Sequence, residues 1–165
     1  MILSSLCYIR KDGKTLMLKR DKREKDFHKG KFNGVGGKFE SGEIPEECLL
    51  REVYEETGLK LVDYQYEGII SFPKFDGVND WYTFVYTSDD FTGDIVDSDE
   101  GTLHWINDGE LASLNLWEGD PYFLEWIYSS EYKDRTFSAK FIYIDKKYMS
   151  HEVIFNRGEK NESNH

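Results

Sequence analysis

The sequence predicts an α/β fold in which helices cover both faces of a mixed β-sheet. Three observations support this prediction. Segments typical of strands alternate with two helical segments in a mixed order, as in α/β sandwiches. The 165 residues suffice for one domain, which at this length buries roughly 70% of its unfolded surface. Hydrophobic residues form 39% of the chain and aromatic residues 16%, a composition that excludes a mainly disordered protein.

The predicted strands share clusters of apolar, β-branched and aromatic residues bounded by turn or loop residues. They lie at residues 3–10, 15–19, 64–71, 81–87, 103–106, 137–144 and 152–155. A turn signal at residues 11–13 joins the first two as a hairpin. Residues 33–37 contain too many glycines for a regular strand interior, and residues 89–100 are predicted as an acidic loop.

Two helices are predicted. Residues 45–57 form the first, because Pro45 suits the first turn of a helix and Gly58 suits the left-handed position just past its end. Residues 121–128 form the second, and Asn107 is expected to cap a short helical turn before it. We therefore expect a single domain over residues 1–155, followed by a polar, frayed tail over residues 156–165.

Composition excludes several classes of protein. The net charge is −11, which disfavours nucleic acid polymers and anionic membranes as partners. Cys7 and Cys48 have no metal-ligand spacing and do not suggest a disulfide scaffold, so a reducing, cytoplasmic location is expected. No apolar run approaches the ~20 residues that a membrane span needs, and the N-terminus lacks the features of a signal peptide. The expected assembly is a monomer or a weak dimer.

Three glutamates share one face of the first predicted helix. Glu52, Glu55 and Glu56 lie at i, i+3 and i+4, a spacing that puts neighbouring Cβ atoms ~5–6 Å apart. Like charges this close repel, and a divalent cation among them would offset the repulsion. Ligation by oxygen alone favours Mg²⁺ or Mn²⁺ over zinc. The alternative is a solvated acidic face. Arg51 can pair with Glu47 or Glu55 and so orient a carboxylate.

The wider spacing favours the cation site. Residues 37–59 match the pattern G-x5-E-x7-R-E-U-x-E-E-x-G-U, where U is a bulky aliphatic residue. The fixed positions are filled by Gly37, Glu43, Arg51, Glu52, Val53, Glu55, Glu56, Gly58 and Leu59. This segment resembles the signature of Nudix hydrolases, and the length and strand order resemble a whole Nudix domain. The resemblance implies a Nudix-type α/β/α sandwich and metal-dependent attack of water on a nucleoside diphosphate linkage.

The resemblance also implies roles for single residues. Glu52, Glu55 and Glu56 match the helix ligands of the metal, and Gly37 matches a residue whose backbone carbonyl binds it. Glu100 matches a distant acidic residue that completes the site or serves as base, although it could be one more charge in an acidic loop. The general base is expected to be Glu52 or Glu56, with Glu100 as the next choice. The implied cofactor is Mg²⁺, for which Mn²⁺ can substitute.

A basic segment precedes the glycine-rich loop. Residues 19–31 contain seven Lys or Arg and three acidic residues, which gives this segment +4 and leaves −15 for the rest of the chain. From composition alone, a solvated loop is the simpler interpretation. Beside a Nudix signature, Arg23, Lys25 or Lys38 could instead bind the polyphosphate of a substrate.

Specificity must come from outside the signature. Residues 32–38, FNGVGGK, resemble the W-N-G-F-G-G-K segment of hydrolases of oxidised purine nucleoside triphosphates, in which the Asn binds the purine. Residues 116–126 resemble their W-P-D-D-S-Y-W-F segment, in which the Trp stacks on the base and two Asp bind its edge. The resemblance thus implies that Asn33, Trp117 and Asp120 bind a purine. Gly119 departs from the pattern by replacing the first Asp. Alone, Trp117 would be interpreted as a core aromatic.

Bacterial branches of the family share further segments. Residues 117–120 and 137–141 resemble MutX-type enzymes. Residues 26–28 resemble the D-A-H triplet of MutT-type enzymes, whose histidine lies near the nucleotide, which implies that Phe27 and His28 face the substrate. The expected function is an 8-oxo-dGTP diphosphatase, which releases the monophosphate and pyrophosphate and sanitises the nucleotide pool. The expected partner is a small nucleotide.

Two alternatives remain open. The first is a Nudix hydrolase of ADP-ribose or of a dinucleoside polyphosphate. A proline about fifteen residues beyond the signature often marks ADP-ribose enzymes, and Pro73 lies fourteen residues after Leu59. The second alternative is a non-catalytic Nudix module that senses a ligand, which the intact signature disfavours.

Overall fold

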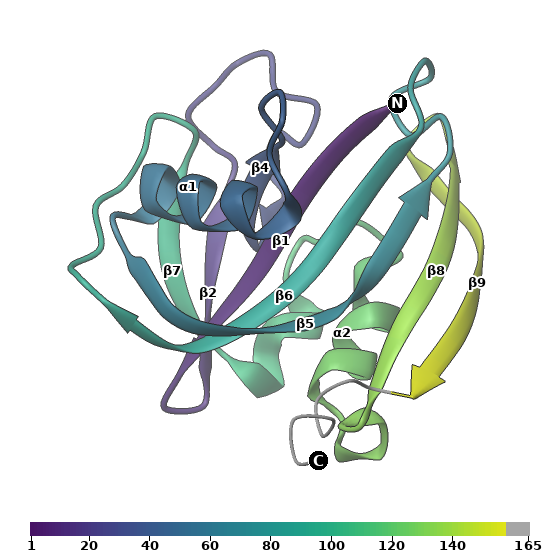
Figure 1. The fold of residues 1–165 in the computed structure, drawn as a ribbon. Helices are drawn as coiled ribbons and strands as arrows, with labels where there is room; N and C mark the ends of the chain where they lie inside the picture. Colours follow the sequence, from purple (N-terminus) through teal and green to yellow (C-terminus); the bar gives the residue numbers. More distant parts are fainter. Residues whose placement is uncertain (158–165) are drawn as a thin grey trace.

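The computed structural model, which describes residues 1–157, contains one mixed nine-stranded sheet with helices on both faces (Figure 1). The strands are β1 (Ile2–Lys11), β2 (Lys14–Lys19), β3 (Phe32–Asn33), β4 (Val35–Lys38), β5 (Lys60–Phe72), β6 (Trp81–Thr92), β7 (Thr102–Asn107), β8 (Arg135–Ile144) and β9 (Lys147–Arg157). The helices are α1 (Pro45–Thr57) and α2 (Asp120–Tyr128), with 3₁₀ segments η1 (Asp108–Ser113) and η2 (Ser130–Tyr132). The predicted α/β/α sandwich is therefore confirmed.

The strand order explains why the sheet is mixed. The order is β3-β2-β1-β6-β5-β8-β9, with β4 also paired to β1 and β7 to β2. The pairs β1–β6 and β5–β8 are parallel, and the other pairs are antiparallel. The hairpin predicted between the first two strands is confirmed. Asp12 and Gly13 both have positive φ, as a two-residue turn between twisted strands requires.

The sheet separates two hydrophobic cores, one under each helix. Leu49 and Val53 of α1 pack in a core with Cys7 and Ile9 of β1. The side chain between them on the strand, Tyr8, points the other way and packs in the core that contains the buried residues of α2. Figure 1 shows α1 in front of the sheet and α2 behind it.

The first helix has the predicted bounds. Pro45 lies in its first turn, and Gly58 ends it in the left-handed conformation at φ 80°, with its N–H donating to the Tyr54 carbonyl. The second helix begins one residue earlier than predicted, at Asp120. Asn107 is the N-cap residue of η1, as predicted, but its side chain makes no capping hydrogen bond and instead donates to Glu110 Oε1.

The prediction that residues 33–37 are too glycine-rich for strand structure is wrong. β4 pairs with β1 from Val35–Cys7 to Lys38–Ser4. Glycine is required here by close approach, since a Cβ on Gly36 would lie 2.0 Å from the Ser5 carbonyl oxygen. The glycines therefore let the β4 backbone lie against β1.

The C-terminal strand extends beyond its predicted limits of residues 152–155. β9 pairs with β8 from Lys147–Ile144 to Arg157–Arg135. Asn156 and Arg157, assigned by the sequence to a frayed tail, are thus part of the sheet, and the remaining residues of that predicted tail, 158–165, lie outside the described residues. Within residues 1–157, no helix combines the length and apolar character needed to cross a membrane.

Candidate active site

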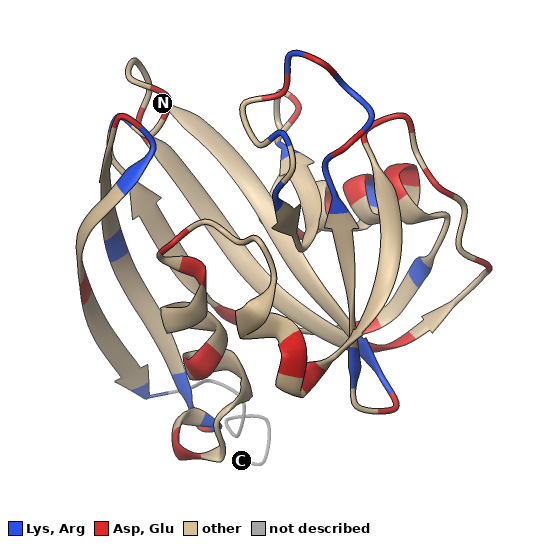
Figure 2. Cartoon of the chain, turned by 180° about the vertical axis from the view of Figure 1, so that it is seen from behind, with Lys and Arg blue, Asp and Glu red and all other residues tan. Residues whose placement is uncertain are grey.

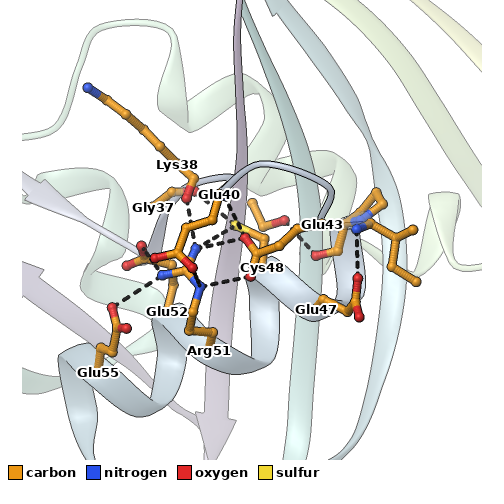
Figure 3. A network of polar contacts seen from close by, with 12 residues as sticks. Gly37, Lys38, Glu40, Glu43, Glu47, Cys48, Arg51, Glu52 and Glu55 are labelled. Carbon is orange, nitrogen blue, oxygen red and sulfur yellow. Dashed lines mark hydrogen bonds and ion pairs between the residues drawn. The ribbon is translucent and has the colours of Figure 1, made fainter.

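Arg51 is the centre of the polar network on α1 (Figure 3). Its guanidinium donates to both carboxylate oxygens of Glu43 at 2.8 and 2.9 Å, to Glu52 at 2.9 Å and to Glu55 at 3.3 Å. It also donates to the Lys38 carbonyl at 3.0 Å, which ties the helix to β4. The predicted pair with Glu55 is confirmed. The alternative pair with Glu47 is wrong, because Glu47 accepts from the Ile44 N–H at the start of the helix.

This network fixes the charge of its members. Hydrogen bonding to Glu43 is the main cause that raises the pKa of Arg51, and the same bonds lower the pKa of Glu43. Both groups therefore stay charged at neutral pH. Arg51 is thus placed to orient the Glu52 carboxylate without losing its own charge.

Glu56 is the buried carboxylate of the site. Its side chain accepts the Gly36 N–H at 2.7 Å, and the residue is only 3% exposed. Burial raises the pKa of Glu56, and hydrogen bonding and negative charge from Glu100 raise it further. Burial also raises the pKa of Glu52, to which the charges of Glu55 and Glu100 contribute. Carboxylates that share such a region are stabilised in the charged form by a cation.

The structure brings three of the four predicted acidic ligands together. Glu52 and Glu100 line one cavity, and Glu56 lies buried next to Glu100. Glu55 does not line this cavity. Its side chain is 55% exposed and is bonded to Arg51. Within residues 1–157, no three acidic, histidine or cysteine side chains already form a metal-binding cluster, and the pairing of Glu52 and Glu55 with Arg51 is consistent with this.

Gly37 lies directly against Glu52. A Cβ at Gly37 would be 2.4 Å from the Glu52 carboxylate, so only glycine allows the β4 backbone to approach this side chain. The Gly37 carbonyl accepts from Cys48 Sγ at 3.3 Å. Carbonyl and carboxylate oxygens are the donors that Mg²⁺ and Mn²⁺ favour, so the donor set at Gly37, Glu52, Glu56 and Glu100 fits such an ion.

The basic loop, residues 19–31, lies against the acidic loop that ends at Glu100. Arg23 forms ion pairs with Asp99 at 3.6 Å and Glu100 at 3.8 Å, and Lys22 Nζ donates to the Ser98 carbonyl at 2.8 Å. Figure 2 shows basic and acidic stretches close together at this end of the sheet. Lys38 lines the cavity, with Nζ 5.4 Å from the centre of the Trp81 ring. Arg23 does not line the cavity but adjoins it through Glu100.

The cavity has a volume of about 650 Å³. Its other end is lined by aromatic rings. The rings of Phe27 and Trp117 are stacked, with centroids 5.5 Å apart and planes at 19°. Trp117 Nε1–H donates to His28 Nδ1 at 2.8 Å. Burial, followed by the charge of Arg20, lowers the pKa of His28 to about 4, so the imidazole is neutral at pH 7.

Asn33 and Asp120 are the predicted purine-binding polar residues that line this cavity. Asn33 comes from β3 and Asp120 from the start of α2, and both line the cavity. Burial raises the pKa of Asp120 to about 7. The structure thus gathers most of the predicted substrate residues around one cavity that also contains Glu52 and Glu100, namely Phe27, His28, Asn33, Lys38, Trp117 and Asp120.

The departure at Gly119 has a steric cause. A Cβ there would lie 2.7 Å from the Phe141 ring and 2.8 Å from the Tyr143 hydroxyl. No side chain fits at this position, so the residue before Asp120 cannot supply a second carboxylate to the cavity.

Sequence reasoning missed several cavity residues, among them Arg20, Phe75 and Tyr143. Phe75 lies in the β5–β6 loop, 4.9 Å from Trp117 between ring centroids. Asp76 holds this loop by accepting from the backbone N–H groups of Val78 and Asn79 and from Trp81 Nε1–H. The aromatic pair in the short segment 72–75 is a signal that could have identified the loop. Tyr143 lies within a predicted strand, and nothing in the sequence around it indicates that it lines a cavity.

The fold and the clustered carboxylates are those of a hydrolase class, and comparison with known proteins gives the family. The NUDIX domain model matches residues 3–127. The chain therefore belongs to the Nudix family, as its signature predicts, and is a hydrolase that acts on phosphoric anhydride bonds. Members of this family act on small nucleotide substrates and generally use divalent metal ions.

Individual relatives agree with this assignment. A Nudix hydrolase of Bacillus subtilis, YvcI, is 32% identical over 125 residues, which cover 73% of this chain and 75% of the relative. The oxidized purine nucleoside triphosphate hydrolase of Danio rerio is 29% identical over 98 residues, which cover 59% of this chain and 63% of that enzyme. Among solved structures, a MutT protein from Bacillus halodurans has a TM-score of 0.82 and 27% identity, covering 93% of this chain and 97% of its own.

Proposed function

We propose that this enzyme is a Mg²⁺-dependent 8-oxo-dGTP diphosphatase that releases 8-oxo-dGMP and pyrophosphate. The observation that supports this proposal is a single cavity with carboxylates at one end and aromatic rings with Asn33 and Asp120 at the other. Such a cavity can hold a triphosphate and a purine at the same time. The relatives named as MutT and as oxidised purine nucleoside triphosphate hydrolases support the same substrate class. The biological role would be to sanitise the cytoplasmic nucleotide pool, which limits the need for DNA repair.

The metal would be held by Glu52, Glu56, Glu100 and the Gly37 carbonyl, with Mn²⁺ as a possible substitute. Glu55 would join these ligands only by leaving Arg51. A bound divalent ion supplies charge stabilisation at the phosphoryl oxygens and lowers the pKa of water. The burial of Glu56 and the raised pKa of both Glu52 and Glu56 support this donor set, because the ion would offset their repulsion.

Side chains of the protein would accept the proton of the attacking water and bind the phosphates. Glu52 lines the cavity and is held by Arg51, so it is placed to accept a proton from the attacking water, with Glu100 as the second carboxylate that faces the cavity. Lys38 binds phosphate oxygens from within the cavity. Arg23, which pairs with Glu100, provides a second cation beside the polyphosphate.

The purine would be bound by stacking and by two polar contacts. Trp117 offers an indole face, but Phe27 already stacks on it. The purine would therefore replace Phe27 on the indole or insert between the two rings. Asp120 and Asn33 would then bond the purine edge, which gives the directional contacts that stacking lacks.

A substrate panel with Mg²⁺ tests the proposal. The enzyme should cleave 8-oxo-dGTP with a higher kcat/KM than dGTP, ADP-ribose or a dinucleoside polyphosphate, and should release pyrophosphate rather than phosphate. A preference for ADP-ribose with release of AMP would contradict the proposed substrate and favour the alternative that Pro73 suggests. No hydrolysis of any of these nucleotides would favour a sensing module.

The remaining proposals concern the domain, the assembly and the partner of the chain. We propose that residues 1–155 act as one catalytic domain, that the protein is a monomer or a weak dimer, and that its partner is the nucleotide rather than a nucleic acid polymer or a membrane. The net charge of −11 supports the last point, because a strongly acidic surface repels polyanions.

A further inference from the structure

Tyr143 places a hydroxyl group in the aromatic part of the cavity. The residue lies near the end of β8, is only 4% exposed and lines the same cavity as Asp120. Its ring is held edge-on by Trp117 and Phe75, at centroid distances of 5.7 and 5.1 Å. Two rings of the proposed base site therefore fix the position of the hydroxyl.

The hydrogen bonds of this hydroxyl leave its proton available. The Tyr143 oxygen accepts the Gly119 N–H at 2.7 Å, which uses one of its two lone pairs. Within residues 1–157, no side chain or carbonyl accepts the Tyr143 O–H. Burial, and then the charge of Asp120, raises the pKa of Tyr143, so the group remains a donor at neutral pH.

Tyr143 and Asp120 both line the cavity, and the Tyr143 hydroxyl bonds to Gly119, the residue next to Asp120, so a donor and an acceptor are available there. A guanine-type base presents a carbonyl acceptor at position 6 and an N–H donor at the adjacent position 1. An adenine-type base presents the reverse, an amino donor at position 6 and an unprotonated nitrogen at position 1. A hydroxyl donor beside a carboxylate acceptor matches the guanine-type edge and mismatches the adenine-type edge.

We propose that the Tyr143 hydroxyl selects 6-oxo purines over 6-amino purines by donating a hydrogen bond to the carbonyl oxygen at position 6, while Asp120 accepts from position 1. This inference rests on the proposed function, since it assumes that the cavity binds a purine. It separates two kinds of selection. Tyr143 distinguishes guanine from adenine, and oxidation at position 8 leaves unchanged the position-6 carbonyl that Tyr143 contacts.

Tyr143→Phe removes only the hydroxyl, so it tests this inference directly. The substrates are dGTP and dITP, which carry the carbonyl, against dATP and the 2,6-diaminopurine deoxynucleoside triphosphate, which carry an amino group. We expect kcat/KM to fall by about tenfold for the first pair, mainly through KM, because one buried hydrogen bond is lost. The second pair should change by less than about threefold.

Tyr148→Phe is the matched control. Its hydroxyl bonds to His151 Nδ1 at 2.7 Å, and its ring lies 6.0 Å from that of Tyr143, but it does not line the cavity. This variant should leave the ratio between the two substrate pairs unchanged. Equal losses on both pairs in Tyr143→Phe would show that the hydroxyl only holds Gly119 and would overturn the inference.

The same variants keep the two proposals distinguishable. If the wild-type enzyme prefers ADP-ribose to every deoxynucleoside triphosphate, the proposed function fails, and dissociation constants for dGMP and dAMP then replace kcat/KM as the measurement. Tighter wild-type binding of dGMP that is lost in Tyr143→Phe would still support the role of Tyr143. Equal wild-type binding of dGMP and dAMP would overturn it.

Discussion

The α1 face and the aromatic end of the cavity are held together by different interactions. On α1, charged side chains lie close together within one short segment, and Arg51 balances several of them. At the aromatic end, rings from the basic loop, the β5–β6 loop, the segment before α2 and β8 pack against each other. The first region concentrates charge for chemistry, and the second provides shape and a few directional polar groups for selection.

This difference means that the two regions should fail in different ways. Removing a carboxylate from the α1 face should reduce the rate on every substrate and leave folding intact. Removing a ring from the aromatic end should cost both binding and stability, because those rings are part of a hydrophobic core.

Glu56→Gln should have the largest effect. The change keeps the size of the side chain but removes a charge from the proposed ion site, where charge stabilisation is worth several kcal/mol. We expect kcat to fall by about a thousandfold or more on any substrate, with a thermal unfolding temperature no lower than that of the wild type. Rates equal to those of the wild type would show that the buried carboxylate is not part of the site.

Trp117→Ala should affect binding and stability together. Loss of base stacking should lower kcat/KM for 8-oxo-dGTP and dGTP by similar factors, which correspond to a loss of about 1–3 kcal/mol of binding free energy. Loss of a buried ring should also lower the free energy of unfolding by about 3–5 kcal/mol. Trp105→Ala, which removes an indole stacked on Phe91 outside the cavity, is the control for nonspecific effects. If only stability changed in Trp117→Ala, the indole would be a core residue and not a base platform.

Asp120→Asn should change how stability depends on pH. The folded pKa of Asp120 is about 7, above its ordinary value of 3.8, so its contribution to stability is complete below about pH 4 and is lost as the pH rises to about 7. That loss is at most about 4 kcal/mol. The variant has no such loss and should gain stability relative to the wild type between about pH 4 and pH 7.

The quantity to compare is the difference in stability between the wild type and Asp120→Asn at each pH, because other groups also titrate. His28, whose pKa is lowered to about 4, acts in the opposite direction, because the unfolded chain binds its proton more readily as the pH falls below about 6.5. Thermal unfolding at about pH 5 and about pH 8 measures the difference, and Asp89→Asn, at an exposed position, is the control. Parallel curves for wild type and Asp120→Asn would contradict a raised pKa of Asp120 in the folded protein.

Metal binding should produce the smallest measurable effect. Mg²⁺ or Mn²⁺ should raise the unfolding temperature by a few degrees, since the ion binds the folded carboxylate face better than the unfolded chain. The rise should shrink in Glu52→Gln. It should persist in Glu152→Gln, which removes the same charge from an exposed position on β9. Equal rises in all three proteins would indicate screening of the net charge instead of a site.

The α1 face was predictable from sequence because its signals are local. The spacing of Glu52, Glu55 and Glu56 and the termini Pro45 and Gly58 are all within a continuous segment. The spacing could not show that Glu55 bonds to Arg51 outside the cavity. Nor could it show that Glu56 is buried and accepts the Gly36 N–H. Those outcomes depend on contacts between α1 and β4, which cannot be predicted from the periodicity of the helix alone.

The aromatic end was only partly predictable because it is assembled from distant segments. Trp117, Asp120 and Asn33 were identified through resemblance to known motifs, whereas Phe75 and Tyr143 were missed. Strand pairing determines where Tyr143 lies, through the parallel pairing of β8 with β5. The same packing explains why the glycine-rich segment forms a strand, since close approach to β1 outweighs the low strand propensity of glycine.

The separation of chemistry from selection is tested most directly by one ratio, kcat/KM for 8-oxo-dGTP divided by kcat/KM for dGTP. We expect the wild-type enzyme to favour the oxidised nucleotide. Glu52→Gln should lower both values and leave the ratio unchanged, because the carboxylate acts on the phosphates. Asp120→Ala should narrow the ratio, because Asp120 accepts from the position-1 edge, which the site should hold more tightly in the conformation that the oxidised base prefers. A ratio that is preserved in Asp120→Ala, or altered in Glu52→Gln, would contradict the division of roles between the two ends of the cavity.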